Sequence, residues 1–202
     1  MFPLDTVLFP SAYLPLHVFE PRYREMVRAC LAGDASFGVT LIERGSEVGG
    51  GDVRTTVGTR ARIVEAAELP DGRWALGTIG VERLRVARWL DDAPYPRAEV
   101  ETWPDEPGTT DADLGELAER TVGRLRRVLA HHAELGDRTA PATLELSDDL
   151  ALRSFQAAAV APLGPIDQQA LLAAPTCAAR YGLLEQLLAD HEDDLRRALE
   201  RE

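Results

Sequence analysis

The densest group of polar and aromatic side chains that could perform chemistry follows an early apolar run. Its members are His17, Glu20, Arg22 and Tyr23. A histidine near a carboxylate could act in acid–base catalysis, or the four side chains could line a binding cleft. The structural alternative is that Glu20 caps a helix beginning at Pro21 and pairs with Arg22 or Arg24. Tyr23 would then pack in the interior. We favour this alternative, because capping alone stabilises a helix by about 1 kcal/mol.

The chain contains no lysine, since all 22 of its basic residues are arginines. A Walker-A loop needs a lysine on the phosphates, and pyridoxal-phosphate enzymes and lysine aldolases need one as a Schiff base. A Ser-Lys protease dyad needs an amine that can lose its proton, which arginine does not. These enzyme classes are excluded. A serine or cysteine hydrolase is not excluded by composition, but the sequence has no G-x-S-x-G motif. We therefore predict no catalytic residues.

Two further segments contain residue types that bind ligands. The glycine-rich stretch Gly45–Gly51 lacks both the G-x-G-x-x-G spacing and a following helix, which favours a flexible hairpin loop that could move over a ligand. The acidic stretch Asp190–Asp194 includes His191, but a helix would point these side chains in different directions. We predict a solvated helix face there and a structural role for His132. The sequence therefore indicates neither a metal site nor a cofactor.

Three tryptophans are the candidate residues for binding a polypeptide. Trp74, Trp89 and Trp103 lie in or beside predicted strands. An exposed tryptophan on a sheet would anchor an extended peptide, because it offers a large apolar area at low entropic cost. Packing in the core is the alternative interpretation of each.

The first half of the chain must position these residues, and its pattern is typical of strands. The predicted strands are 7–9, 13–18, 37–42, 55–69, 73–79, 82–89 and 97–103. One helix interrupts them after Pro21, with Gly33 as a left-handed stop. The turn Pro70-Asp71-Gly72 joins two of the strands. About six strands in roughly 100 residues favour a closed or nearly closed barrel.

Helical periodicity begins after a proline-rich break at 104–108. One apolar stripe runs from Leu114 to His132 and is closed by Gly136. Ser147 is the predicted N-cap of a second helix that ends near Val160, and a short third helix spans 165–173. The last helix begins near Pro175, and its long stripe must lie against the preceding helices or a partner chain. We favour the preceding helices.

Charge and cysteine content limit the partners and the compartment. The net charge of −12 is shared by both halves, so nucleic acid and anionic membranes are disfavoured as partners. Cys30 and Cys177 lack a metal-binding spacing and are predicted to be buried free thiols of a reducing compartment. Neither a signal peptide nor an apolar stretch of about 20 residues is present. We expect a cytoplasmic protein whose oligomeric state the sequence does not determine.

Several motifs together resemble the Lon substrate-binding (N-terminal) domain family. They begin with Val7-Leu8-Phe9-Pro10 and Leu14-Pro15-Leu16-His17-Val18-Phe19-Glu20-Pro21-Arg22-Tyr23, and continue with Phe37-Gly38-Val39, Gly45-Ser46-Glu47-Val48-Gly49, Arg83-Leu84-Arg85-Val86 and Gln169-Ala170-Leu171-Leu172. The resemblance covers nearly the whole chain. It is nearest to stand-alone bacterial members that lack the ATPase and protease domains.

The resemblance implies an α+β protein with a β-barrel-like domain, related to PUA domains, at residues 1–106. A helical domain at 107–202 would follow and end in a long C-terminal helix. The resemblance also implies recognition of protein substrates. We predict a non-catalytic module that binds unfolded or extended polypeptide, with strand addition at an open barrel edge as the physical mode. The alternatives are an adaptor for one folded partner and, on fold analogy, an RNA-binding module.

Overall fold

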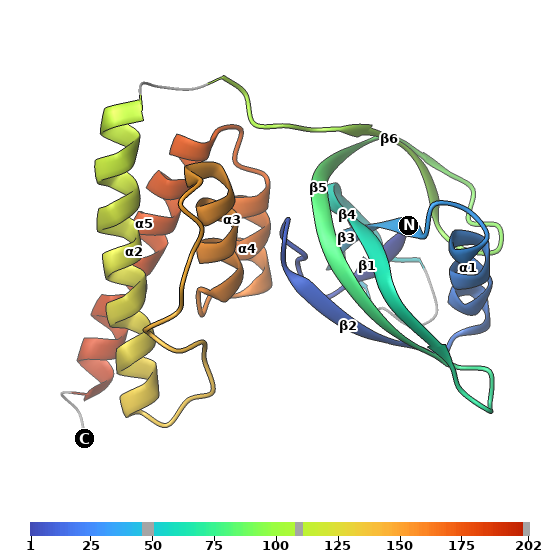
Figure 1. Ribbon diagram of the computed structural model, residues 1–202, viewed down its shortest axis with the longest axis horizontal. Coiled ribbons are helices and arrows are strands. Elements are labelled where there is room, and N and C mark those ends of the chain that lie inside the picture. Colours follow the sequence, from blue (N-terminus) through green and yellow to red (C-terminus); the bar gives the residue numbers. More distant parts are fainter. Residues whose placement is uncertain (46–50, 108–110, 200–202) are drawn as a thin grey trace. The chain divides into compact units, whose positions relative to one another are not determined.

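The computed structural model describes residues 1–45, 51–107 and 111–199 (Figure 1). Two compact units follow each other along the chain, Met1–Pro104 and Asp105–Glu202. The first unit contains the strands and one helix, and the second contains helices. The chain is therefore an α+β protein with a helical C-terminal segment, as its sequence predicts. The predicted domain boundary between residues 106 and 107 stays a prediction.

The first unit is built on one six-stranded sheet. Its strands are β1 (Phe2–Leu4), β2 (Tyr13–Val18), β3 (Ser36–Arg44), β4 (Val53–Glu68), β5 (Trp74–Leu90) and β6 (Arg97–Thr102). The hydrogen-bonded order is β1-β3-β4-β5-β2, and β6 also pairs with β5. β1 runs parallel to β3, whereas the other pairs are antiparallel. β5 is long enough to pair with β2 along its first half and with β6 along its second half.

The sheet curls around its core and is barrel-like (Figure 1). A hydrogen bond joins the residues that directly precede β1 and β6, since the amino group of Met1 donates to the carbonyl of Pro96 at 2.7 Å. Helix α1 (Pro21–Leu31) contributes Tyr23, Met26 and Val27 to the core. The other buried members of this core are Phe2, Leu4, Leu8, Val18, Phe37, Val39, Ala61, Ile63 and Leu76.

The start of the sheet differs from the sequence prediction. The predicted strand at 7–9 is wrong, since these residues lie outside the sheet, and the unpredicted β1 precedes them. Leu8 and Phe9 are nevertheless buried, which accounts for their apolar character. β1 is short and pairs with residues 39–41, so its partner is distant in the sequence and no local periodicity marks it.

The strands predicted at 73–79 and 82–89 form the single strand β5, which continues through Gly80. A Cβ atom at Gly80 would lie 2.2 Å from the carbonyl oxygen of Phe9. Glycine is required here for this close approach of two backbones, and it does not end the strand.

Helix α1 begins at Pro21 as predicted, but its C-terminal end does not use glycine. Glu20 occupies the N-cap position, although its side chain makes no capping hydrogen bond. The predicted left-handed stop at Gly33 is wrong. The left-handed residue is Ala35, with φ of 53°, and its amide donates to the carbonyl of Cys30 at 2.9 Å. The chain thus turns two residues later than the glycine suggested.

The second unit contains four helices. They are α2 (Asp111–Glu134), α3 (Leu150–Val160), α4 (Pro165–Leu172) and α5 (Cys177–Leu199). α5 packs along α2 and also contacts α3 and α4, so the predicted packing of its stripe within the chain is confirmed. Gly136, with φ of 83°, follows α2 as expected. The N-cap of α3 is Asp149 rather than the predicted Ser147, because the Asp149 carboxylate accepts from the amide of Leu152 at 2.7 Å.

A buried arginine holds the start of the second unit to its helices. Arg180 on α5 is fully buried and forms two hydrogen bonds with the carboxylate of Asp105, at 3.1 and 2.5 Å. Its Nε donates to the hydroxyl of Ser154, and its guanidinium lies 3.6 Å from the ring centroid of Phe155. No helix in the described ranges is long and apolar enough to cross a bilayer.

Candidate functional site

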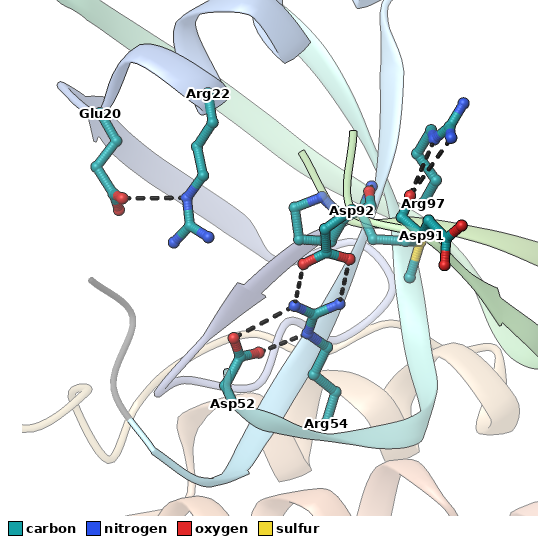
Figure 2. A network of polar contacts seen from close by, with 9 residues as sticks. Glu20, Arg22, Asp52, Arg54, Asp91, Asp92 and Arg97 are labelled. Atoms are coloured by element: carbon teal, nitrogen blue, oxygen red, sulfur yellow. Dashed lines mark hydrogen bonds and ion pairs between the residues drawn. The ribbon is translucent and has the colours of Figure 1, made fainter. Parts of the chain in front are cut away.

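The polar cluster at the start of α1 makes structural contacts, and three of its members, His17, Glu20 and Tyr23, also line a hollow beside β2. The Glu20 carboxylate accepts from Nε of Arg22 at 3.1 Å (Figure 2), and the Arg22 guanidinium lies 4.5 Å from the ring centroid of Tyr23. Tyr23 packs on Phe2 with ring centroids 4.3 Å apart, and burial raises its pKa to about 12. These contacts confirm the expected pairing of Glu20 and packing of Tyr23. His17, by contrast, is exposed on β2.

β2 is an edge strand, because among the described residues it pairs with β5 alone. Gly80 donates its amide to the carbonyl of Ala12 at 2.9 Å, and the register continues unbroken from there. Hydrogen-bonded pairs alternate along an antiparallel ladder, so Leu14, Leu16 and Val18 exchange bonds with β5. The intervening Tyr13, Pro15 and His17 therefore direct their backbone groups to the open side.

The side chains of β2 alternate in the same way. Leu14, Leu16 and Val18 face the core, whereas Tyr13, Pro15 and His17 are exposed on the outer face. Pro15 has no amide hydrogen and stands at an outward position, where the β5 ladder loses no donor. A proline inside a strand is typical of an edge strand, but which side of this strand is open depends on the pairing of the other strands.

Two hollows border β2, one on each face of the sheet. The inner one has a volume of about 260 Å³, and the outer groove has a volume of about 480 Å³. Both include Pro15, Leu16 and His17. The inner hollow is also lined by Phe2, Leu4, Asp5, Thr6, Leu14, Val18, Phe19, Glu20 and Tyr23. The outer groove is also lined by Tyr13, Glu65, Ala66, Ala67, Ala75, Leu76 and Gly77. The edge strand thus separates two hollows with apolar walls.

The floor of the outer groove consists of small residues, which leaves space above the strands. Ala67, Ala75 and Gly77 supply the floor, and Tyr13 lies across it. A Cβ atom at Gly77 would lie 2.6 Å from the hydroxyl of Tyr13, so glycine is needed for the ring to rest on the strand. Tyr13 remains 57% exposed, which leaves most of its aromatic surface free for a ligand.

The three tryptophans do not come together. Trp74 and Trp89 occupy opposite ends of β5, and Trp103 follows β6. Each is half-buried. Trp74 packs against the core cluster and stands opposite Val18, so of the three it alone flanks the β2 edge. Its indole nitrogen is buried and has no hydrogen-bond partner among the described residues.

Arginines cover the other two tryptophan rings. The guanidinium of Arg54 lies 4.9 Å from the ring centroid of Trp89, and those of Arg83 and Arg85 lie 4.2 Å from that of Trp103. Asp52 and Asp92 hold Arg54 by ion pairs at 2.5 and 2.8 Å (Figure 2). Burial lowers the pKa of Arg54, but the hydrogen bonds that it donates to the two aspartates raise its pKa overall. A ligand would have to displace these cations to reach either ring.

The acidic stretch of α5 is only partly a solvated face. Glu192 is buried and binds Arg124 at 2.5 Å and Arg127 at 3.1 Å, which differs from the expectation. His191 meets His132, with 2.8 Å between their Nε2 atoms, and Nδ1 of His132 lies 2.7 Å from Asp137. The ion pairs of Glu192 and the contact between His132 and His191 join α2 to α5. The contact between His132 and Asp137 fixes the end of α2. In the described part of the chain no group of three or more histidine, cysteine, aspartate or glutamate side chains is placed to hold a metal ion.

The remaining candidates offer no reactive group. Most of the Gly45–Gly51 stretch, residues 46–50, lies outside the described residues. Cys30 and Cys177 are half-buried free thiols. Burial raises the pKa of each thiol, which makes both poor nucleophiles at neutral pH.

Relatives with related sequences are Lon proteases. The Koribacter versatilis Lon protease is 25% identical over 187 residues, which is 92% of this chain and 23% of that protein. The Trichlorobacter lovleyi Lon protease is 31% identical over 147 residues, covering 72% of this chain and 18% of that protein. The chain therefore spans less than a quarter of the length of these curated relatives.

Solved structures extend the likeness over both units. A Lon N-terminal domain protein from Xanthomonas campestris is 31% identical, with a TM-score of 0.64 over 93% of this chain and 95% of that one. The N-terminal domain of the Mycobacterium avium complex Lon protease is 18% identical, with a TM-score of 0.66 over 94% and 97%. The second comparison shows the fold alone.

The family model for the ATP-dependent protease La (LON) substrate-binding domain matches residues 1–190, which include all the strands and nearly all of the helical unit. Together with the curved sheet, its edge strand and the relatives above, this match confirms the resemblance that the opening motifs indicated. The chain belongs to the family of Lon substrate-binding domains.

Proposed function

We propose that this chain recognises protein substrates by binding unfolded or extended polypeptide and performs no chemistry of its own. The observation that carries the proposal is the β2 edge, where a strand with an open side separates two apolar hollows. Sheet edges of this kind bind extended chains through backbone hydrogen bonds and pockets for alternate side chains. Membership of the family supports the same conclusion.

Several features support a function that involves no catalysis, no cofactor and no binding of nucleic acid. His17 is exposed, His132 is held between His191 and Asp137 in a contact that joins two helices, and burial raises the pKa of both half-buried thiols. An RNA-binding face would need free arginines on the sheet, but Arg60 pairs with Glu82, and Arg83 and Arg85 stack on Trp103. A cytoplasmic location and the absence of a membrane partner remain part of the same proposal.

An adaptor that binds one folded partner is the second candidate. A single large apolar patch would favour it. Among the large apolar side chains of the described residues, Ile166 on α4 is the most exposed, at 81%, and it belongs to the helical unit. The hollows at β2 lie in the first unit and follow a strand, which favours an extended ligand.

Fluorescence anisotropy of a labelled, permanently unfolded polypeptide tests the proposal directly. We expect saturable binding in the micromolar range, competed by other unfolded chains and not by their folded forms. No binding up to several hundred micromolar would overturn polypeptide recognition and leave the adaptor as the leading account.

A further inference from the structure

The outward backbone groups of β2 form a short template for another strand. The amides of Tyr13 and His17 and the carbonyls of Tyr13, Pro15 and His17 face away from β5, as the register requires. An edge strand with such groups is ready to pair with a further extended chain. A chain paired with β2 would lie between the two hollows that border this strand.

The two hollows would receive alternate side chains of that added strand. Successive side chains of a strand point to opposite faces of the sheet. One set would enter the inner hollow, whose walls include Phe2, Leu4 and Leu14. The other set would lie in the outer groove beside Tyr13 and Glu65. An apolar side chain suits the first position because burial among apolar walls is favourable.

Charge determines what suits the outer groove. Glu65 is the carboxylate that lines the outer groove, and no arginine lines that groove. The carboxylates that line the inner hollow are Asp5 and Glu20, and Glu20 is paired with Arg22. Glu65 is exposed beside the aromatic ring of Tyr13. A cationic side chain in the groove would gain from the carboxylate and from the face of the ring. The chain as a whole, with a net charge of −12, also attracts cationic segments.

We propose that β2 is the docking edge, and that its occupant is an extended segment of another polypeptide in which apolar residues alternate with basic ones. The apolar side chains enter the inner hollow and the basic side chains lie in the outer groove. This inference rests on the proposed function, because it names the surface and the sequence pattern by which the polypeptide is bound.

The first test compares three labelled peptides with the full chain by anisotropy. One alternates valine with arginine, one has the same composition with the valines in a block, and one alternates valine with glutamate. We expect the first to bind at least tenfold more tightly than the other two. Equal affinity for the alternating and blocked arginine peptides would overturn strand addition.

The second test follows amide hydrogen exchange of the full chain by NMR, with and without the alternating arginine peptide. We expect the peptide to slow exchange at Tyr13 and His17, whose amides face outward. Leu14, Leu16 and Val18 should change little, because their amides already bond to β5. Such an alternating response would not result from a ligand that merely lies on the surface.

Matched variants separate the backbone contact from the side chain. His17→Pro removes an outward amide and should weaken binding about tenfold, whereas His17→Ala loses a side chain that lines the hollows but keeps the amide, and should weaken binding clearly less than His17→Pro. Thr102→Pro is the control, because it removes an amide on β6, which also pairs with β5 but does not border the two hollows. The amide of Trp103 donates to the carbonyl of Arg83. Because hydrogen-bonded pairs alternate along the β5–β6 ladder, the amide of the neighbouring Thr102 faces away from β5. Glu65→Gln should weaken only the arginine peptide, about threefold.

The outcomes distinguish the two proposals. Binding of unfolded polypeptide without slower exchange at Tyr13 and His17 would overturn the β2 site and leave the proposed function intact. No binding of unfolded polypeptide or of any peptide would overturn both. Slow exchange at these amides before any peptide is added, together with a dimer in sedimentation equilibrium, would assign the edge to a second copy of this chain and overturn the inference.

Discussion

The two units satisfy their backbone groups in different ways. In the helical unit each helix forms its hydrogen bonds within one segment, so only its ends and side chains are available to others. In the sheet unit each strand depends on a neighbour, and β2 has a neighbour on one side only among the described residues. The sheet therefore exposes a backbone template, which the helices do not.

The side chains of the two units reinforce this difference. In the helical unit, buried or half-buried arginines are engaged with carboxylates of other helices or of the unit's first residues, as Arg180 is with Asp105 and Arg124 is with Glu185. In the sheet unit, the hollows beside β2 are bordered by carboxylates and by the exposed ring of Tyr13. Ion pairs occur in both units, as the pairs of Arg54 with Asp52 and Asp92 show for the sheet unit, but only the sheet unit has an open strand edge among the described residues. This difference supports our proposal that the sheet unit is the one that binds polypeptide.

Arg180→Met is expected to have the largest effect and to act on the helical unit alone. It leaves the carboxylate of Asp105 without its bidentate partner, and breaking such a pair costs about 3–5 kcal/mol. Urea unfolding should be followed by far-UV circular dichroism, which reports the helices, and by tryptophan fluorescence. All three tryptophans lie within Met1–Pro104, so their fluorescence reports the sheet unit.

We expect the helical signal of Arg180→Met to unfold at lower urea, with the tryptophan transition and peptide binding unchanged. Arg88→Ala is the control, because Arg88 and Glu99 form an exposed pair whose loss should change stability by less than about 0.5 kcal/mol. Equal shifts of both signals in Arg180→Met would mean that the two units unfold as one.

Glycine-to-alanine substitutions should have opposite signs in the two units. A Cβ at Gly58 on β4 would lie 2.1 Å from the carbonyl oxygen of Val39, so Gly58→Ala should destabilise the sheet unit by about 1–3 kcal/mol. Nothing lies within 4 Å of a Cβ at Gly182 on α5, so Gly182→Ala should stabilise the helical unit by about 1 kcal/mol. Thermal unfolding followed by the same two signals measures both, and effects of the same sign would contradict the comparison.

The smallest expected effects are on the acid sensitivity of the two units. Burial raises the pKa of Asp52, but its hydrogen bonds and the charge of Arg54 lower it overall. Burial likewise raises the pKa of Glu192, and Arg127 and Arg124 lower it overall. A carboxylate whose pKa falls on folding stabilises the protein above its ordinary pKa, and this contribution is lost as the pH drops through the folded value.

Asp52→Asn should therefore lower the stability of the sheet unit by about 1 kcal/mol at pH 7, and Glu192→Gln should do the same in the helical unit. Each deficit should shrink at pH 3, where the native carboxylate is increasingly protonated. Urea midpoints at the two pH values, read from tryptophan fluorescence for Asp52→Asn and from circular dichroism for Glu192→Gln, provide the measurement. A deficit that is the same at both pH values would contradict the assigned charges.

Much of the fold could be predicted because local patterns carry it. The turn at Pro70–Gly72, the proline that opens α1 and the apolar stripe of α5 each depend on neighbouring residues, and the structure has all three where expected. The errors have two causes, a distant partner that decides the local structure or a choice between two residues close together in the chain. Gly80 continues a strand because Phe9 approaches it, and Asp149 rather than Ser147 takes the N-cap of α3.

The candidate site was less predictable. The three tryptophans are still candidates for binding, but only Trp74 lies beside the β2 edge, and arginines cover the rings of the other two. The sequence named His17 for its chemistry, whereas the structure gives it an outward amide on an edge strand. Nothing in residues 13–18 alone reveals which side of that strand stays open.

By itself the sequence determined the family, the succession of strands and helices, and the exclusion of lysine-dependent chemistry, because motifs, periodicity and composition are local properties of the chain. Only the tertiary structure decided that β1 pairs with β3, that Arg180 meets Asp105 and that β2 ends the sheet. These contacts join residues far apart in the chain. Their formation depends on how every other strand and helix packs, and no local pattern encodes that arrangement.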